Sequence, residues 1–237
     1  MKYLIVNADD FGASAGINRG ILEAHEHGIV TSASLMVNMP AAKEAASLSR
    51  GFPGLSVGLH ANFTNEGEDP PVVDLADSSA CREELRRQLR DFERMMGHPP
   101  THLDSHQNVH RTPHLLPHFL ELAAEYDVPM REHSPVRYFE RFYGQWSEGE
   151  THLEWIGPEN LCRLLEAELD DGFTELGCHP GYFDPHFQSV YHIERESELK
   201  ALCDAAVRRQ LTEWQVKLIN FRDVSSLSNV KSVVRAL

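Results

Sequence analysis

The chain has 237 residues, a length that fits one large domain or two small ones. Its formal net charge of −14 argues against a nucleic-acid backbone or an anionic membrane surface as a partner. The four cysteines are far apart and form no Cys-x-x-Cys pair, which favours reduced thiols and a cytoplasmic location over a disulfide framework. No apolar run approaches membrane length, so we expect no membrane insertion.

Strand-like and helix-like segments alternate along the chain, with Gly and Pro marking many of the boundaries. In chain order the predicted elements are strand 2–7, helix 15–27, strand 31–38, helix 40–51, strand 55–60, helix 82–96, strand 101–106, helix 113–126, strand 128–131, helix 158–171, strand 174–179, helix 194–210 and strand 216–220. Two stretches lack this periodicity. Residues 62–79 are predicted to be a substrate-side loop, and the aromatic residues 133–157 a long lid or wall.

This alternation, with no internal repeat and no Gly/Ser-rich linker, predicts one α/β domain over residues 1–237 with a mostly parallel sheet. No Gly-x-Gly-x-x-Gly follows a strand, which argues against a Rossmann sheet. Polar residues end several well-separated strands, as they do in barrel enzymes. We therefore expect a closed or partly closed (β/α) barrel of seven or eight strands.

The first strand ends in two adjacent carboxylates, Asp9 and Asp10, which are followed by Gly12. Ligands of α/β proteins bind at the carboxyl ends of parallel strands, so this is a place for chemistry. Two neighbouring carboxylates repel each other, and their pKa values separate unless a cation lies between them. A metal bound by one acid, with the other left as a base, would resolve the repulsion. The plainer alternative is a helix-capping Asp beside a surface Asp.

Three further strand ends carry side chains that can bind a metal: His60, Asp104 with His106, and His179. A single histidine at a strand end is more often structural, but strand ends converge on one face of such a fold. Two imidazoles and one carboxylate are a common ligand set for a divalent catalytic metal. Asp104 and His106 point to one side of an extended segment, so one can ligate while the other orients a neighbour. His110 is an alternative ligand if the segment turns helical.

At these positions the chain resembles the YdjC-like carbohydrate deacetylases, a family that includes chitooligosaccharide deacetylases and hopanoid-associated relatives. The resembling blocks are Asn7-Ala-Asp-Asp-Phe-Gly12, Gly58-Leu-His60, His102-Leu-Asp-Ser-His106 with Val109-His110, Cys178-His-Pro-Gly181 and Asn220-Phe-Arg-Asp223. The resemblance implies a distorted (β/α) barrel, and members often form homodimers. The chain departs from the family pattern at Asn108, where many members have another histidine, and at Ala61-Asn-Phe-Thr64. Both departures could alter the fit of a substrate.

Carried over position by position, the resemblance implies that Asp10, His60 and His106 bind one divalent metal ion. Zn²⁺ and Mg²⁺ are the first candidates, with Mn²⁺, Co²⁺ and Ni²⁺ as alternatives. The resemblance also implies that Asp9 is the general base and His179 the general acid. The implied reaction is hydrolysis of the amide in an N-acetylated sugar, such as a chitooligosaccharide, with release of acetate. Asp9 would deprotonate a metal-activated water, and His179 would protonate the leaving amine.

Two other functions remain open on the residues alone. A phosphoesterase-like metal hydrolase would need more ligands and cationic phosphate clamps, but the basic residues do not cluster around these motifs. A non-catalytic carbohydrate-binding barrel would tolerate the loss of Asp9 or His179, yet both are present. Arg131 could hold Asp9, a substrate oxygen or a structural ion pair. The aromatic residues of 138–155 could stack on sugar faces or form that loop's own core.

Overall fold

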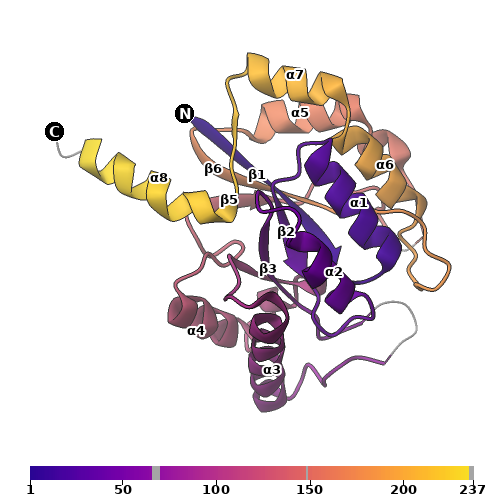
Figure 1. The fold of residues 1–237 in the computed structure, drawn as a ribbon, viewed down its shortest axis with the longest axis vertical. Helices are drawn as coiled ribbons and strands as arrows, with labels where there is room; N and C mark the ends of the chain where they lie inside the picture. Colours follow the sequence, from indigo (N-terminus) through magenta and orange to yellow (C-terminus); the bar gives the residue numbers. More distant parts are fainter. Residues whose placement is uncertain (66–69, 148, 235–237) are drawn as a thin grey trace.

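The computed structural model describes residues 1–65, 70–147 and 149–234, with side chains up to residue 227. Its centre is a parallel sheet in the order β4-β3-β2-β1-β6-β5, with β7 paired to the first residues of β1. The strands are β1 (Lys2–Phe11), β2 (Ser32–Leu35), β3 (Ser56–Ala61), β4 (Leu103–Ser105), β5 (Val136–Phe139), β6 (Gly172–Cys178) and β7 (Lys217–Leu218). The sheet curls into a half-barrel flanked by helices (Figure 1). An α/β distorted barrel, as predicted, is confirmed, but within the described residues its outermost strands β4 and β5 do not pair with each other.

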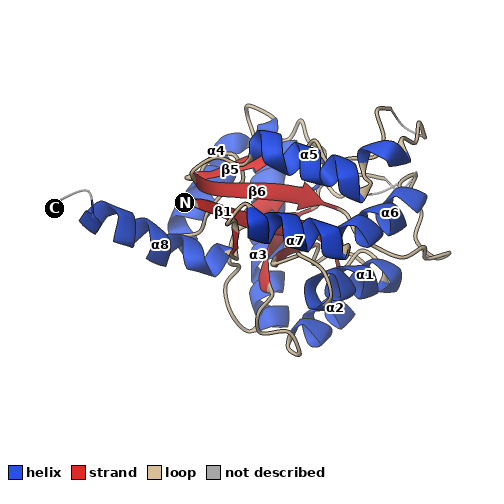
Figure 2. Ribbon diagram, turned by 90° about the horizontal axis from the view of Figure 1, so that it is seen from above, coloured by secondary structure: helices blue, strands red, loops and turns tan. Residues whose placement is uncertain are grey.

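Helices connect the strands and cover the sheet (Figures 1 and 2). They are α1 (Ala15–Glu26), α2 (Ala42–Ser49), α3 (Ser78–Met96), α4 (Leu116–Tyr126), α5 (Pro158–Glu168), α6 (Ile193–Leu202), α7 (Ala205–Glu213) and α8 (Phe221–Val234), with short 3₁₀ turns η1 (His106–Arg111) and η2 (Leu153–Trp155). Side-chain caps explain several starts: Ser14 accepts the N–H of Ile17 at α1, and Asp77 caps α3. No described helix is both long and apolar enough to span a bilayer.

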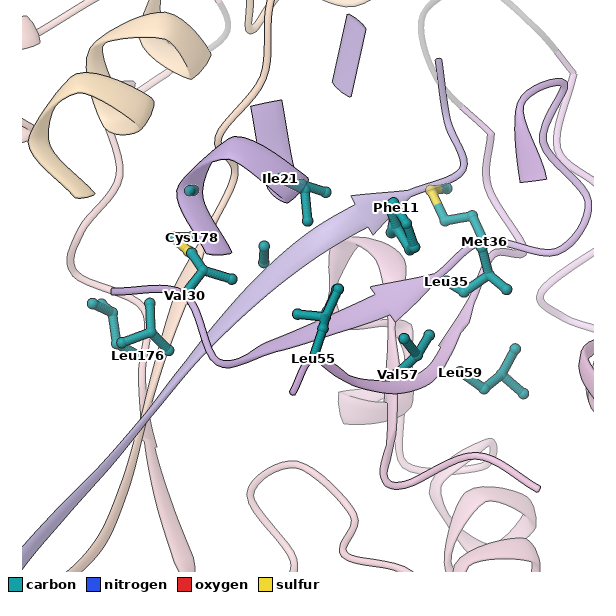
Figure 3. Close-up of a cluster of buried hydrophobic side chains, with 14 of the residues drawn as sticks. Phe11, Ile21, Val30, Leu35, Met36, Leu55, Val57, Leu59, Leu176 and Cys178 are labelled. Carbon is teal, nitrogen blue, oxygen red and sulfur yellow. The ribbon is translucent and has the colours of Figure 1, made fainter. Parts of the chain in front are cut away.

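The main core lies between the sheet and the helices. The central strand β1 contributes side chains to this core from one of its faces and to a second cluster from the other. Leu4, Val6 and Ala8 point into this core, part of which is shown in Figure 3. Tyr3 and Ile5 alternate with them and pack in a second cluster on the other face. The same alternation places Asn7 and Asp9 beyond Ile5 on the second face. The polar site therefore begins where the apolar part of that face ends.

Two predicted elements are wrong, and two observed elements were not predicted. Residues 128–131 form no strand and contribute only an isolated bridge between Leu103 and Met130. The next strand along the chain is β5, which lies inside the stretch predicted to be irregular. Its central residues are partly exposed, so it lacks the apolar run of a buried strand. The predicted helix 194–210 is two helices, because Asp204 accepts the N–H of Ala206 at 2.7 Å and starts α7. Helix α8 was not predicted; it extends away from the body beside the amino terminus (Figures 1 and 2).

Candidate active site

A backbone irregularity at the end of β1 turns both acids of the Asp9–Asp10 pair toward one cavity. Asp10 has a left-handed backbone conformation, with φ of 65°. The register of β1 against β2 shifts between Ala8 and Phe11, which marks a bulge. In a regular strand two successive side chains would point to opposite faces. Because of the bulge, Asp9 and Asp10 both line the same cavity.

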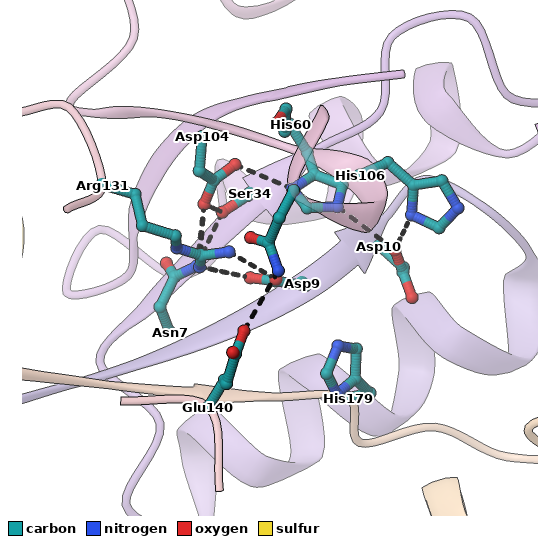
Figure 4. A network of polar contacts seen from close by, with 12 residues as sticks. Asn7, Asp9, Asp10, Ser34, His60, Asp104, His106, Arg131, Glu140 and His179 are labelled. Atoms are coloured by element: carbon teal, nitrogen blue, oxygen red, sulfur yellow. Dashed lines mark hydrogen bonds and ion pairs between the residues drawn. The ribbon is translucent and has the colours of Figure 1, made fainter. Parts of the chain in front are cut away.

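Asp10, His60 and His106 meet at the ends of β1, β3 and β4, as the sequence predicted (Figure 4). One potential ligand atom from each lies within 4.8 Å of the others, and all three side chains are buried. Oδ1 of Asp10 is 3.4 Å from Nε2 of His60 and 3.2 Å from Nδ1 of His106. This oxygen makes no hydrogen bond to any described residue, although it is buried. A carboxylate oxygen facing two imidazole nitrogens is a donor set that fits a divalent cation.

Asp104 contacts the opposite edge of the His60 ring. Its Oδ1 lies 2.7 Å from Nδ1 of His60, which leaves Nε2 of His60 directed at Asp10. Burial lowers the pKa of His60, but Asp104, Asp9 and Asp10 outweigh this effect and raise it to about 10. Of the two roles that the sequence left open for Asp104, this geometry favours orientation of a neighbouring histidine.

Arg131 binds both carboxylate oxygens of Asp9 and links this residue to two further acids. Its Nη1 and Nη2 each donate to one oxygen of Asp9 at 2.8 Å. Nη2 also lies 3.0 Å from Oδ2 of Asp104, and Nε and Nη2 donate to Oε1 of Glu175 at 2.9 and 2.7 Å. Burial alone would lower the pKa of Arg131, but the three carboxylates raise it well above its ordinary value. Arg131 is therefore a permanent buried cation whose position determines that of Asp9.

His179 directly follows β6 on the other side of the cavity, and helix α6 packs behind it. The pKa of His179 is lowered by burial but raised overall, chiefly by the nearby carboxylate of Glu198. From the same helix, Nη2 of Arg195 donates to Oδ2 of Asp10 at 2.7 Å. Burial raises the pKa of Asp10, but Arg195, His106 and His60 outweigh it and hold this pKa well below its ordinary value. Oδ1 of Asp10 therefore remains as the oxygen that faces the two histidines.

These groups surround a cavity of about 480 Å³. Its walls include the predicted base and acid, Asp9 and His179, as well as all three predicted ligands, Asp10, His60 and His106. His110 does not join the ligand cluster. It lies in η1, with Nδ1 2.6 Å from Oγ of Ser105 and Nε2 3.1 Å from Glu132.

The two predicted loops contribute unequally to this cavity. Of residues 62–79, positions 66–69 lie outside the described residues, as does position 148 of the 133–157 stretch. In the aromatic loop, Phe139 and Phe142 are buried in the core, whereas Tyr143 lines the cavity and Trp146 is 62% exposed. Asn108 also lines the cavity and donates to Glu140 at 3.1 Å.

Charge balance adds to the case for a bound cation. Four carboxylates meet in the buried network, from Asp9, Asp10, Asp104 and Glu175, and two guanidinium groups, from Arg131 and Arg195, oppose them. Without a metal, the raised pKa of His60 lets that ring carry one compensating proton. With the acids ionised and the histidines deprotonated, as metal ligation requires, the six groups carry a net charge of about −2. Buried charge is costly unless it is compensated. A divalent cation between Asp10, His60 and His106 would compensate it.

His102 is buried next to this network and stays neutral. Its Nε2 lies 3.2 Å from Oγ of Ser34, which itself donates to Asp104 at 2.6 Å. Its ring stacks on Phe221 at a centroid distance of 3.8 Å. Burial is the largest influence and lowers the pKa of His102 to about 4, although Asp104 opposes the shift.

This burial predicts a loss of stability in mild acid. Unfolded His102 takes up a proton near pH 6.5, whereas the folded protein does so only near pH 4. The folded pKa is the lower one, so the contribution of His102 is present above pH 6.5 and is lost as the pH falls. We expect the free energy of unfolding to drop by about 3 kcal/mol from this residue between pH 6.5 and 4. Urea titrations of wild type and His102→Gln test this, and identical pH slopes would contradict it.

Several residues of the site were missed by sequence reasoning, namely Ser34, Glu175, Tyr191, Arg195 and Glu198. They lie inside strands, helices or a loop rather than at the motif positions. One usable signal was present in α6. Its buried face carries charged side chains, which are seldom fully buried without a partner.

A curled parallel sheet with acids and histidines gathered at its strand ends places this protein among the α/β half-barrels with a candidate metal centre. The chain belongs to the YdjC-like protein family, whose model matches residues 3–213. It is 38% identical to a carbohydrate deacetylase of Geobacillus stearothermophilus, over 95% of this chain and 99% of the relative. It is 33% identical to a chitooligosaccharide deacetylase of Serratia marcescens, over 94% of this chain and 99% of the relative.

Solved structures show the same fold. The crystal structure of a candidate cellobiose-phosphate cleavage protein from Enterococcus faecalis V583 matches with a TM-score of 0.81 and 28% identity, covering 94% of this chain and 98% of that chain. A family 4 carbohydrate esterase from Streptomyces lividans matches with a TM-score of 0.57 and 13% identity, covering 92% of this chain and 91% of that chain. The second likeness is one of fold alone.

Proposed function

We propose that this protein is a metal-dependent carbohydrate deacetylase that hydrolyses the acetamide of an N-acetylated sugar and releases acetate. The observation that carries the proposal is the meeting in one cavity of the Asp10, His60 and His106 cluster with Asp9 and His179. Relatives named carbohydrate deacetylase and chitooligosaccharide deacetylase support the substrate class. A cytoplasmic location, favoured by the cysteine pattern, and a homodimer, implied by the family resemblance, are part of this proposal.

Asp10, His60 and His106 are the residues that would hold the metal, with Zn²⁺ and Mg²⁺ as first candidates. Such an ion, when bound, supplies Lewis-acid polarisation of the acyl oxygen and an acidified water. Asp104 keeps His60 oriented from its far edge. Arg195 donates a hydrogen bond to Oδ2 of Asp10, so that Oδ1 is left to bind the cation.

Asp9 acts as the general base in this proposal. Arg131 fixes its carboxylate with two hydrogen bonds, and Asn7 donates a third to Oδ1. Each carboxylate oxygen has two lone pairs, so Oδ2, with one donor, can still accept a proton from the attacking water. The arginine orients the base without using up its capacity to accept.

His179 acts as the general acid and delivers a proton to the departing amine. Its raised pKa favours the protonated form that this role requires. Tyr143, 39% exposed, lies edge-on to His179 with ring centroids 5.4 Å apart. Its ring stacks on Tyr191 with centroids 4.5 Å apart, which holds it in place as part of the cavity wall. The apolar face of a sugar can pack against Tyr143 and bring its acetamide next to His179.

The test is acetate release from N-acetylglucosamine and its β-linked oligomers, with chelator-treated protein reloaded separately with Zn²⁺, Mg²⁺, Mn²⁺, Co²⁺ or Ni²⁺. We expect release only from reloaded protein, and about one ion per chain. His106→Ala should lose the ion and the activity, while the exposed His27→Ala keeps both. Full activity in stripped protein, or an unchanged metal content in His106→Ala, would contradict the proposal.

The same assay with 4-nitrophenyl phosphate tests the phosphoesterase alternative. Arg195 is the one lysine or arginine among the described residues that line the cavity, and it already binds Asp10. A phosphate would therefore find no available cationic clamp there. We expect no phosphate release.

A further inference from the structure

Helix α6 turns three charged side chains inward, and each is at most 4% exposed: Glu194, Arg195 and Glu198. Fully buried charges need partners. Glu194 accepts a hydrogen bond from Gln145 at 2.8 Å and so anchors the aromatic loop. Arg195 reaches the proposed metal ligand Asp10. The third residue, Glu198, has no exposed surface and faces the segment that carries His179.

The carboxylate of Glu198 contacts His179 at two points. Oε2 accepts the backbone N–H of His179 at 2.5 Å, which fixes the main chain at the end of β6. Oε1 lies 3.7 Å from Nδ1 of the His179 ring, within ion-pair distance. Oε1 also accepts a hydrogen bond from the hydroxyl of Tyr191, and that hydroxyl accepts the N–H of Gly144 at 2.8 Å. Glu198 is therefore held rigidly while it holds His179.

This arrangement distinguishes the two nitrogens of His179. Nδ1 is buried on the side of Glu198 and makes no hydrogen bond to any described residue, so its contact with Oε1 is an ion pair, yet the side chain as a whole is 23% exposed. The exposed edge of the ring is therefore the edge that carries Nε2, and His179 lines the cavity. Tyr143 and Tyr191 lie edge-on to the ring, with centroids 5.4 and 5.8 Å away, and limit its rotation.

We propose that Glu198 is the positioning residue of the acid: it holds the Nδ1 edge of His179 against α6, so that the proton for the leaving amine comes from Nε2. This inference rests on the proposed deacetylase function. As the C–N bond of the acetamide breaks, the amine nitrogen takes the Nε2 proton. The neutral ring keeps its other proton on Nδ1, toward Glu198. The negative charge of Glu198 stabilises the protonated ring before the transfer, consistent with the raised pKa of His179.

The test compares two acetyl substrates that differ in their need for an acid. An amino sugar must leave as a protonated amine, whereas the 4-nitrophenolate of 4-nitrophenyl acetate leaves without a proton. We expect Glu198→Gln to lower kcat for the N-acetylated sugar by about 10- to 100-fold, with KM changed less than about threefold. Hydrolysis of the nitrophenyl ester should fall less than about threefold.

A double-mutant cycle shows whether Glu198 acts through His179. His179→Ala should lower sugar deacetylation by about 10²- to 10⁴-fold. In that background Glu198→Gln should change the rate by less than about twofold, because the group that it positions is gone. Glu194→Gln is the matched control, a buried glutamate of the same helix. Any effect that it has should add to that of His179→Ala, because no described contact joins Glu194 to His179.

Tyr191→Phe provides a second variant, which removes one hydrogen bond to Glu198 while keeping its charge. We expect a smaller loss, about 3- to 10-fold, again confined to the amide substrate. The inference is overturned if Glu198→Gln slows both substrates alike or adds to the effect of His179→Ala. In that case the proposed function survives, because His179→Ala remains defective. If His179→Ala deacetylates sugars normally, the acid assignment and this inference both fail.

Discussion

The Asp9→Asn variant is expected to lose about 10²- to 10⁴-fold in kcat for acetate release while keeping its bound metal. Asp9 lines the cavity beside Asp10 and lies outside the Asp10, His60 and His106 cluster, although it forms a second cluster of potential ligand atoms with His60 and Asp104. The metal is expected to stay because the first cluster keeps all three of its ligands. An amide of the same shape cannot take up a proton from water at neutral pH. Steady-state acetate release and elemental analysis of the same preparation measure the two effects. Full activity in the variant would rule out Asp9 as the base.

Stability must be measured alongside, because Asp9 is also a structural partner of Arg131. In the Asp9→Asn variant an amide N–H₂ replaces one of the two oxygens that accept from the guanidinium. Glu175→Gln is a suitable control, since it alters a different carboxylate on the same guanidinium and leaves Asp9 in place. We expect it to retain kcat within about tenfold. A comparable loss of kcat in both variants would mean that the Arg131 network, rather than proton transfer, explains the defect.

Replacing Arg131 with methionine is expected to lower the free energy of unfolding by about 3–5 kcal/mol. Arg131 is 3% exposed and bonds to Asp9 and Glu175, with Asp104 at 3.0 Å. Its removal leaves three carboxylates buried without their common cation. Urea unfolding of metal-loaded and metal-stripped protein measures the loss.

A partial rescue identifies the cause. Glu175→Gln in the Arg131→Met background removes one of the stranded charges, so it should recover part of the lost stability. The pKa of Glu175 is already raised by burial to about 7, so its neutral form suits this position. Arg131→Lys should fall between wild type and Arg131→Met, because lysine keeps the charge but not the two-pronged contact. A loss below about 1 kcal/mol in Arg131→Met would show that the carboxylates are compensated in another way.

Much of the candidate site follows from the chain read in order. Asp10, His60, His106 and His179 each come directly at or after a strand end, and strands of one parallel sheet end along the same edge. Their convergence is therefore a consequence of local pattern plus one rule of sheet geometry. Elements with weak local sequence signals are harder to predict. Strand β5 is short and half-exposed, and the break between α6 and α7 depends on a single capping Asp204.

The sequence by itself determined the α/β alternation, the family resemblance and the residues that can hold a metal, since these depend on side-chain chemistry and short-range periodicity. Only the tertiary structure decided how those residues work together. The bulge at Asp10 directs the side chains of two adjacent acids toward one cavity, whereas regular strand alternation would point them to opposite faces of the sheet. The partners Arg131 and Arg195 come from 122 and 185 positions away along the chain. A buried charge is tolerated only where the fold brings it a counter-charge, and no local pattern encodes that meeting.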